Sequence, residues 1–375
     1  MPAMLGIASI LIDRNLASLG QWTTPDDATR AEQLVSAAQT IQPDSEDVRV
    51  VAAELLQAQG RWTDLAVAAQ RLIELYPNRV EGFELLGMAK RFIGSPEETV
   101  ELYEKSLRLN PLESNLSNRC SCMAYALLLV GRYAESIEWF ERSLAANPQA
   151  SDAIRGARYR SIASAQALIG HVAAAQETMR EADRLSPYAT ARIFVPDNPA
   201  SPEQVKQINR LIEGLRLAGL PDHADADADF GVTSDSVLRQ NLAGPTPVTV
   251  SGATTLSTTE LVSFLKDRKP LVIDAMLYFA GRSIPGVIGL RNAGLGGGYS
   301  DTAQGRLRQK FLALTKGDPS TPIVTVGWNS LRFDGRNLAL RLLALGYTNV
   351  YWYRGGREAW EVAGLPETQV DIQDW

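Results

Sequence analysis

The sequence has few of the side chains on which metal and thiol chemistry depend. Its 375 residues include two cysteines, Cys120 and Cys122, and two histidines, His171 and His223. Two cysteines cannot build a disulfide framework, which predicts a reducing, cytoplasmic environment. Two histidines that lie far apart in the sequence give little basis for a metal centre. We therefore expect neither a metal nor another cofactor.

Long hydrophobic runs and clusters of positive charge are also missing. No stretch approaches the roughly 18 apolar residues of a membrane-spanning helix. The short apolar run at residues 4–12 has no basic residue before it and no small-residue cleavage site after it, so we expect no secretory signal. With 37 Lys+Arg against 43 Asp+Glu, the formal charge is −6, which argues against nucleic-acid binding. The 45% hydrophobic residues are ordinary for a globular chain, and the length predicts two or three domains.

Prolines recur at regular intervals over the first two hundred residues. Pro43, Pro77 and Pro111 are 34 residues apart, Pro148 follows after 37 and Pro187 after 39. A period near 34 is typical of a helix-turn-helix repeat. In four units a glycine stands 17 residues before the proline, where its left-handed backbone can end a first helix; the proline then ends the second. These glycines are Gly60, Gly94, Gly131 and Gly170.

The repeat units resemble tetratricopeptide repeats (TPR). In the unit at residues 80–113 the matching positions are Phe83, Leu86, Gly87, Ala89, Gly94, Tyr103, Leu107 and Pro111. In the unit at residues 117–150 they are Gly131, Tyr133, Ile137, Phe140, Leu144 and Pro148. We predict N-terminal helices with a degenerate repeat at residues 1–45, and a solenoid with four clear units at residues 46–220, closed by a capping helix at 202–218.

The TPR resemblance implies a stacked superhelix whose groove binds a protein or peptide. The alternative is a solenoid that only spaces or dimerises other domains. Cys120 and Cys122, two residues apart in a first helix, are expected to be packed apolar side chains rather than a redox or metal pair. The region from Pro148 to the ending GLRLAGLPDHAD also resembles the C-terminal repeats of some bacterial class III adenylate cyclases, which suggests bacterial signalling.

Residues 221–247 change in composition and predict an acidic linker. Alternating Asp and Ala at 225–229 look like the start of a calcium loop, but Phe230 and Ser236 occupy the positions that need Gly and Glu. We therefore expect a solvated linker without a metal.

Strands and helices alternate in the last 125 residues. Continuous apolar runs at 270–275, 322–326 and 349–352 predict buried strands, with helical patterns at 258–266, 302–315 and 335–345 between them. This order predicts an α/β domain with a parallel sheet and helices on both sides. The whole chain is thus a multidomain protein, an all-α solenoid followed by an α/β domain.

Three strings in this region resemble the rhodanese family. They are Leu271-Val-Ile-Asp274, then Ser283-Ile-Pro-Gly-Val-Ile288 with Ser283 in place of a family histidine, and the block from Leu345 to Trp360. Together they cover about residues 250–366, and we assign residues 248–375 to a rhodanese-like domain. The resemblance implies a cysteine thiolate in the loop after the central strand, where inward amides stabilise a persulfide or an oxyanion.

The family cysteine is missing from this loop. An alignment from the strand places Gly327 at its position, and an alignment from the following helix places Trp328 there. We therefore expect no catalytic residue. A nucleophilic Ser330 is not favoured, because no histidine follows residue 223. The candidate ligand-binding residues are Gly327, Trp328, Asn329, Ser330, Leu331, Arg332, Phe333, Asp334 and Gly335 of the loop, together with Arg282 and Asp274.

Charged side chains near the loop raise the question of anion binding. Asp334 is expected to cap the next helix and so to fill the site with its own carboxylate. Arg282, Arg332 and Arg336 are candidates for holding a small anion, but the interpretation as exposed surface arginines is favoured. The glycine-rich stretch at residues 292–300 lacks the spacing and the lysine of a phosphate loop, and we predict a flexible turn there.

These features favour an adaptor or scaffold in which the TPR groove binds a partner and an inactive rhodanese-like domain serves as a recognition module. One alternative is a sulfurtransferase whose thiol is supplied in trans. A second is a regulatory partner of a class III adenylate cyclase-type signalling system. Neither nucleic acid nor membrane is an expected partner.

Overall fold

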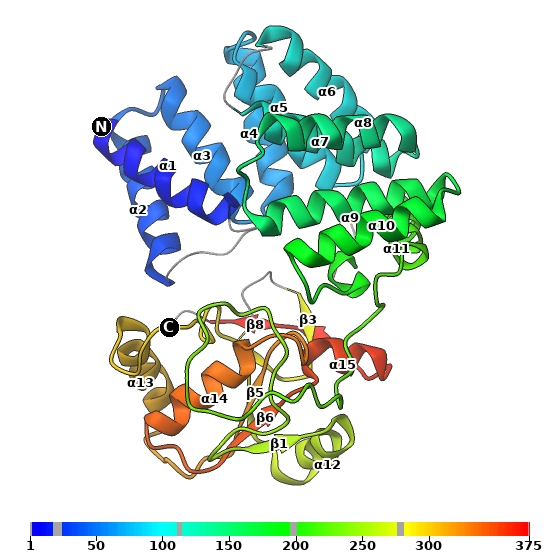
Figure 1. The fold of residues 1–375 in the computed structure, drawn as a ribbon. Helices are drawn as coiled ribbons and strands as arrows, with labels where there is room; N and C mark the ends of the chain where they lie inside the picture. Colours follow the sequence, from blue (N-terminus) through cyan, green and yellow to red (C-terminus); the bar gives the residue numbers. More distant parts are fainter. Residues whose placement is uncertain (1, 18–24, 111–114, 196–200, 276–280, 374) are drawn as a thin grey trace. The chain divides into compact units, whose positions relative to one another are not determined.

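The computed structural model describes residues 2–17, 25–110, 115–195, 201–275, 281–373 and 375 (Figure 1). The chain divides into two compact units, Met1–Asp222 (unit 1) and His223–Trp375 (unit 2). Parts of two predicted repeats, residues 18–24 and 111–114, lie outside the described residues.

Unit 1 consists of helices that pack as successive pairs. Apolar side chains of neighbouring helices form its cores, with Leu65, Phe140 and Ala175 fully buried. The helices are α1 (Pro2–Ala17), α2 (Pro25–Ile41), α3 (Glu46–Ala58), α4 (Trp62–Leu75), α5 (Val80–Phe92), α6 (Pro96–Leu109), α7 (Leu116–Leu129), α8 (Tyr133–Ala146), α9 (Asp152–Leu168), α10 (Val172–Leu185), the 3-10 turn η1 (Ala191–Phe194) and α11 (Pro202–Leu217). The predicted all-α solenoid of successive helix pairs is confirmed.

The turn between the two helices of each pair follows one design. Gly60, Gly94, Gly131 and Gly170 have φ of 68°, 94°, 84° and 89°. In every case the next residue donates its N–H to a carbonyl five positions back, for example Arg61 to Leu56 at 2.9 Å and Ser95 to Lys90 at 2.8 Å. This is the Schellman arrangement that ends a helix at a left-handed glycine. The glycine period therefore sets the repeat geometry.

Helix α11 packs on α9 and also reaches back over earlier repeats. Its carbonyl at Leu211 accepts from Ser164 Oγ of α9 at 2.8 Å. The Gln204 side chain near its start donates to the carbonyl of Phe92, at the end of α5, at 2.8 Å. Arg210 donates to the hydroxyl of Tyr133, at the start of α8, at 3.3 Å. The helix thus runs along the edge formed by the interhelical turns.

Unit 2 contains a parallel sheet in the order β1-β6-β5-β2-β4-β8. Strand β5 pairs in register with β2 and β6, with Val326 opposite Asp274 and Tyr353. A short antiparallel pair, β3-β7, lies outside this sheet. The strands are β1 (Thr254–Leu256), β2 (Leu271–Asp274), β3 (Arg282–Ser283), β4 (Ile288–Gly289), β5 (Ile323–Val326), β6 (Val350–Tyr353), β7 (Thr368–Gln369) and β8 (Asp371–Ile372).

Helices cover both faces of this sheet, as the sequence predicts. Helices α13 (Thr302–Leu314) and α14 (Asp334–Ala344) pack on one face, and α12 (Thr258–Arg268) and α15 (Gly356–Val362) on the other. The α/β domain with a parallel sheet is confirmed. Within the described part of the chain, no helix has the length and apolar character needed to cross a bilayer.

Candidate functional site

The loop at residues 327–335 joins the end of β5 to the start of α14, at the carboxyl edge of the middle of the sheet. Ligands of open α/β sheets bind at this edge. Gly327 and Gly335 face each other: a Cβ atom on Gly327 would lie 2.9 Å from the Gly335 nitrogen, and a Cβ atom on Gly335 would lie 2.8 Å from the Gly327 nitrogen. No side chain therefore fits at position 327 unless the main chain shifts.

The first part of the loop turns its carbonyl groups toward α15. The N–H groups of Arg357 and Glu358 donate to the carbonyls of Gly327 and Trp328, both at 3.0 Å. A Cβ atom on Gly356, whose φ is 62°, would lie 2.4 Å from the Trp328 carbonyl oxygen, so this approach requires glycine. These amides at the start of α15 are thus used by the loop itself rather than by an anion.

Asn329 and Ser330 are buried and hydrogen-bonded. Asn329 Nδ2 donates to Glu358 Oε2 at 3.0 Å, and the same oxygen accepts from the Ala224 N–H at 2.7 Å. Ser330 is 0% exposed and its hydroxyl donates to the Asp225 carbonyl at 2.7 Å. The Ser330 hydroxyl is thus engaged within unit 2, by the main chain of the acidic segment.

Asp334 does not cap the helix as expected. It is the first residue of α14 and makes no side-chain capping bond. Its carboxylate accepts instead from Arg332, with Nε to Oδ2 at 2.8 Å and Nη2 to Oδ1 at 3.1 Å. A charged fork that matches both carboxylate oxygens competes well against neutral amides. Arg332 is therefore engaged by Asp334. Only 15% of its side chain is exposed, so it is not an exposed surface arginine.

The other two candidate arginines have different partners. Arg336 is 0% exposed and donates to the main-chain carbonyl of Val237 at 3.0 Å and to Asp235 Oδ1 at 2.7 Å. Arg282, on β3, is half-exposed and donates to the Glu367 carbonyl at 2.7 Å. The three arginines therefore bind partners on different segments of unit 2.

Asp274 and Ser283 form a buried pair. Asp274 ends β2, and its Oδ2 accepts from the hydroxyl of Ser283 at 3.1 Å. Both residues are at most 4% exposed. Ser283, which replaces the family histidine, therefore braces the strand end and faces no open site.

The acidic segment at residues 223–247, called the covering segment below, differs from the solvated linker that we expected. It belongs to unit 2, and in Figure 1 it is the green trace that runs beside α14. Leu238 and Leu242 are each 6% exposed. At 225–229 the aspartates point outward and the alanines are half-buried. The acidic side chains are thus solvated as predicted, but the main chain is anchored.

Arg354 holds the first part of the covering segment. Its guanidinium donates to the carbonyls of Ala226 at 2.7 Å, Ala228 at 2.8 Å and Thr246 at 3.0 Å. Burial lowers the pKa of Arg354, and the carboxylates of the surrounding aspartates act to raise it. The acidic composition of the segment therefore compensates a buried cation.

The second part of the covering segment pairs with the loop. Gly244 N–H donates to the Leu331 carbonyl at 2.8 Å, and Phe333 N–H donates to the Leu242 carbonyl at 2.9 Å. Thr246 donates to the Ser330 carbonyl through its N–H at 3.0 Å and its hydroxyl at 2.7 Å. The chain's own segment thus occupies this face of the candidate site.

The glycine-rich stretch is not the flexible turn that we predicted. It wraps around Arg341 of α14, which is 0% exposed and donates to the carbonyls of Leu295, Gly296 and Gly298 and to both oxygens of Asp301. The stretch also lies against the covering segment. A Cβ atom on Gly296 would lie 2.7 Å from the main chain of that segment, so glycine is required at this position.

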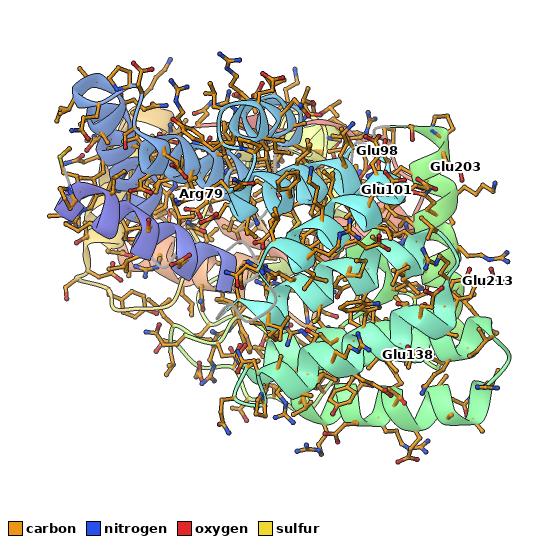
Figure 2. The ribbon with its side chains drawn as sticks, turned by 90° about the horizontal axis from the view of Figure 1, so that it is seen from above. Arg79, Glu98, Glu101, Glu138, Glu203 and Glu213 are labelled. Atoms are coloured by element: carbon orange, nitrogen blue, oxygen red, sulfur yellow. The ribbon has the colours of Figure 1, made fainter. Side chains whose placement is uncertain are left out.

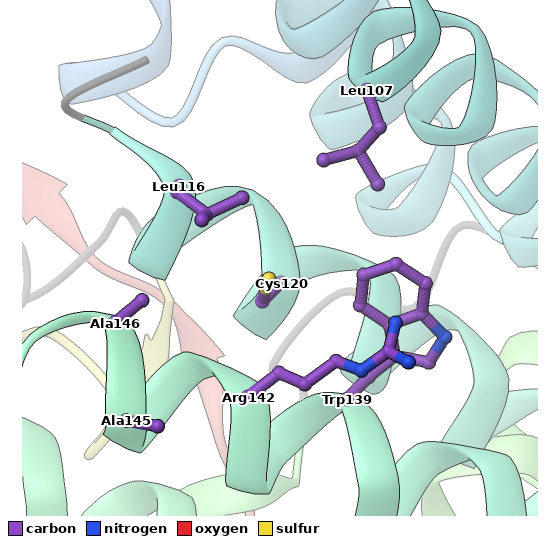
Figure 3. A pocket seen from close by; sticks show the side chains of 7 residues that line it. All are labelled: Leu107, Leu116, Cys120, Trp139, Arg142, Ala145 and Ala146. Atoms are coloured by element: carbon purple, nitrogen blue, oxygen red, sulfur yellow. The ribbon is translucent and has the colours of Figure 1, made fainter. Parts of the chain in front are cut away.

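Unit 1 has a hollow of about 510 Å³ between α6, α7 and α8 (Figure 3). Cys120 and Trp139 face it, and Arg142 stands over the Trp139 ring, 4.7 Å from its centroid. Burial raises the pKa of the Cys120 thiol, although the charges of Arg142, Arg158 and Arg119 act to lower it. Cys120 and Cys122 are both buried and free, which confirms the prediction of packed thiols.

Unit 2 has a second hollow, of about 520 Å³, on the sheet face covered by α12 and α15. Apolar side chains such as Val272 and Trp360 line it, with Lys266 and Lys269 among its lining residues. None of the loop residues 327–335 lines it, so it is separate from the candidate site. Across the described residues, no cluster of three or more potential metal ligands is found.

Sequence reasoning missed four side chains that organise the site: Asn337, Arg341, Arg354 and Glu358. All are at most 4% exposed. Three of them occupy helices, where a buried polar residue looks like one on a solvated face. A signal existed in Arg354, which directly precedes Gly355-Gly356 in the block that resembles rhodanese.

Comparisons with known proteins match the C-terminal part of the chain to one family. The family description "Rhodanese-like domain" matches residues 257–363, so the chain carries a C-terminal rhodanese-like domain. A comparison with curated proteins gives no match.

Solved structures similar to this chain include TPR proteins. A MamA protein is 16% identical over 49% of this chain and 93% of its own, with a TM-score of 0.35. A second structure, MamA AMB-1, is 19% identical over 50% of this chain and 100% of its own, with a TM-score of 0.35. TTC0263, a thermophilic TPR protein in Thermus thermophilus, is 14% identical over 51% of this chain and 92% of its own, also with a TM-score of 0.35.

Proposed function

We propose that the protein is a two-domain adaptor. The solenoid binds a partner segment, and the rhodanese-like domain acts as a recognition module without sulfur-transfer chemistry. One observation supports the proposed role of the rhodanese-like domain. The loop after β5 has no cysteine, and residues 223–247 of the chain are hydrogen-bonded to it. A rhodanese-type loop without its thiol cannot form a persulfide.

A thiosulfate-to-cyanide sulfur transfer assay on the full-length protein tests the absence of catalysis. We expect no activity above buffer in the wild type, in Gly327→Cys or in Trp328→Cys. At position 327 the new Cβ atom meets the Gly335 nitrogen at 2.9 Å, and at both positions the covering segment still closes the loop. Activity of the wild type, with or without an added low-molecular-weight thiol, would contradict the proposal.

The proposed binding of a partner by unit 1 rests on the first helices of three successive pairs, α5, α7 and α9. The Arg91 guanidinium of α5 stands 5.1 Å from the ring centroid of Tyr125 on α7, so cationic and aromatic groups meet on adjacent repeats. The second helices instead carry exposed glutamates, among them Glu101 and Glu138, labelled in Figure 2. Such a difference in charge between two sides of a solenoid favours partner recognition along one of them.

A displayed random-peptide library selected on the wild type tests this half. We expect the selected peptides to lose affinity at least tenfold for Arg91→Glu and to keep it for Arg180→Glu. The control residue Arg180 is exposed on the second helix α10 and pairs locally with Glu177. Selected peptides that bind both variants equally would show that the row of first helices is not the binding surface.

A further inference from the structure

Buried side chains of unit 2 contact the covering segment mainly through its main chain. Arg354 donates to the carbonyls of Ala226 and Ala228, two residues apart. Arg336 donates to the carbonyls of Asp235 at 2.5 Å and Val237 at 3.0 Å, again two residues apart. Between the first two carbonyls the chain turns, since Asp225 Oδ1 accepts from the N–H groups of Asp227 at 2.9 Å and Ala228 at 3.2 Å. The two arginines therefore bind main-chain carbonyls of an irregular segment.

Asn337 completes this pattern. Its Oδ1 accepts from the Arg239 N–H at 3.1 Å, and its Nδ2 donates to the Arg239 carbonyl at 3.0 Å. One side-chain amide thus pairs with both main-chain groups of a single residue, as a neighbouring strand would. Main-chain contacts of this kind give affinity with little dependence on sequence.

Side-chain contacts add specificity at a few positions. Asp235 Oδ1 lies 2.7 Å from Arg336 Nη2, so the site favours a carboxylate there. Partial burial acts to raise the pKa of Asp235, but hydrogen bonds from the Val237 N–H and from Arg336 outweigh it and hold the pKa below its ordinary value. Leu238 and Leu242 are buried, the latter against Phe333. The bound segment is thus acidic, with aliphatic residues after its carboxylate.

We propose that this face of unit 2, formed by the loop 327–335 with Arg336, Asn337 and Arg354, is a binding site for an acidic peptide segment of a partner. The covering segment is its intramolecular occupant. The inference rests on the proposed role of unit 2 as a recognition module and names the ligand class. A tethered segment competes at an effective concentration on the order of millimolar, so a partner binds only when the covering segment is weakened or displaced.

A labelled synthetic peptide of residues 224–246 serves as the probe, with the full-length protein as receptor. Asp235→Asn removes the carboxylate from the covering segment but leaves Arg336 free to bind the aspartate of the peptide. We expect this variant to bind the peptide roughly 10- to 100-fold more tightly than the wild type, the range for loss of a hydrogen bond to a charged group. A peptide carrying Asn at position 235 should not show this gain.

Two further variants control the experiment. Asp267→Asn makes the same charge change at an exposed position on α12 and should behave like the wild type. Leu242→Ala weakens the covering segment through packing instead of charge and should also increase peptide binding. Unchanged hydrogen exchange in β5 would show that each variant is folded.

Hydrogen exchange also separates the outcomes. In Asp235→Asn the amides of Gly244, Thr246 and Phe333 should exchange faster together, because they join the segment to the loop. Faster exchange without peptide binding overturns the proposal, since the exposed face then has no affinity for such a segment. Unchanged exchange without peptide binding overturns it as well, because the segment is then a fixed part of the fold. Sulfur transfer by the wild type would instead contradict the adaptor function and leave the peptide result standing.

Discussion

The two units use arginine in opposite ways. In unit 1 many arginines pair with a carboxylate one turn away on an exposed helix face, as Arg184 does with Glu181, with 66% and 36% of the side chains exposed. In unit 2, Arg336, Arg341 and Arg354 are buried and donate to main-chain carbonyls of irregular segments. Unit 1 has exceptions, because Arg119, Arg158 and Arg160 are also buried, and Arg119 and Arg160 donate to main-chain carbonyls as well.

This difference follows from what each fold leaves unsatisfied. Helices satisfy their own main-chain groups, so a repeat unit needs charged side chains mainly for solubility. The glycine-rich stretch and the covering segment have no ladder, and their buried carbonyls need donors from elsewhere. An arginine offers five such donors in one side chain. Stability is therefore distributed along unit 1 but depends on a few side chains in unit 2.

Arg341→Met should have the largest effect of the substitutions considered. It leaves the carbonyls of the glycine-rich stretch and Asp301 without their cation, so we expect unit 2 to lose about 3–5 kcal/mol, the cost of breaking a buried pair. Hydrogen exchange of the β5 and β2 amides measures this for unit 2 alone. Arg184→Met is the matched control in unit 1 and should leave exchange unchanged. Equal effects of the two substitutions would remove the contrast between the units.

A half-buried carboxylate makes the stability of unit 1 depend on pH. Burial raises the pKa of Glu54 on α3 to about 7, aided by the charges of Asp13, Glu81 and Glu84 and opposed by Arg79. A raised carboxyl pKa means that the folded state binds the proton more tightly than the unfolded state. Stability of unit 1 therefore falls as the pH rises from about 4.5 through about 7.

Glu54→Gln should remove this dependence. We expect it to stabilise unit 1 by up to about 3 kcal/mol above pH 8 and to change little at pH 5. Thermal unfolding at the two pH values measures the effect, with hydrogen exchange to assign it to unit 1. Glu138→Gln, at the exposed position labelled in Figure 2, should show no such dependence. The same effect at both pH values would mean that the pKa of Glu54 is not raised in the folded protein.

Two glycines of unit 2 give opposite predictions for one substitution. Gly327→Ala places a Cβ atom 2.9 Å from the Gly335 nitrogen and should cost about 1–3 kcal/mol. Gly305→Ala, inside α13, meets nothing within 4 Å and should stabilise by about 0.5–1 kcal/mol. Urea unfolding followed in unit 2 checks both. Stabilisation by Gly327→Ala would show that the loop has room for a side chain.

The sequence predicts unit 1 well because its repeat is local. Each glycine that begins a turn and each proline that ends a pair acts within its own 34 to 39 residues. The reach of α11 back to Phe92 is not local, since it joins residues 112 positions apart through a glutamine side chain, and no periodic pattern predicts it.

In unit 2 the sequence predicts the strands and helices but not the packing of irregular segments. The apolar runs at 271–274 and 323–326 are continuous because both faces of the sheet are covered. The covering segment was expected to be solvated, and its aspartates at 225–229 do point outward. Its anchoring depends on Arg354, more than 120 residues away along the chain. Composition reports side-chain solvation and gives no information on main-chain partners.

A hydroxyl contact that recurs in two helix pairs of unit 1 gives the smallest expected difference in stability between the two units. Thr99 Oγ1 donates to the Gly87 carbonyl at 2.9 Å, and 37 residues later Ser136 Oγ donates to the Ala124 carbonyl at 2.8 Å. Both hydroxyls are buried and join the second helix of a pair to the first. Ser136→Ala should therefore cost about 1 kcal/mol, the net contribution of one buried hydrogen bond.

The matched substitution is Ser263→Ala on α12 of unit 2, whose hydroxyl donates to the carbonyl of Thr259 four residues earlier at an exposed position. A local bond of this kind adds little to a helix, so no loss is expected. Chemical denaturation of the full-length protein, with exchange to assign each transition, compares the two. A loss for Ser136→Ala confined to α7 and α8 would indicate that the repeats unfold as separable pairs. An equal loss across α3 to α10 would show that unit 1 unfolds cooperatively despite its repetitive construction.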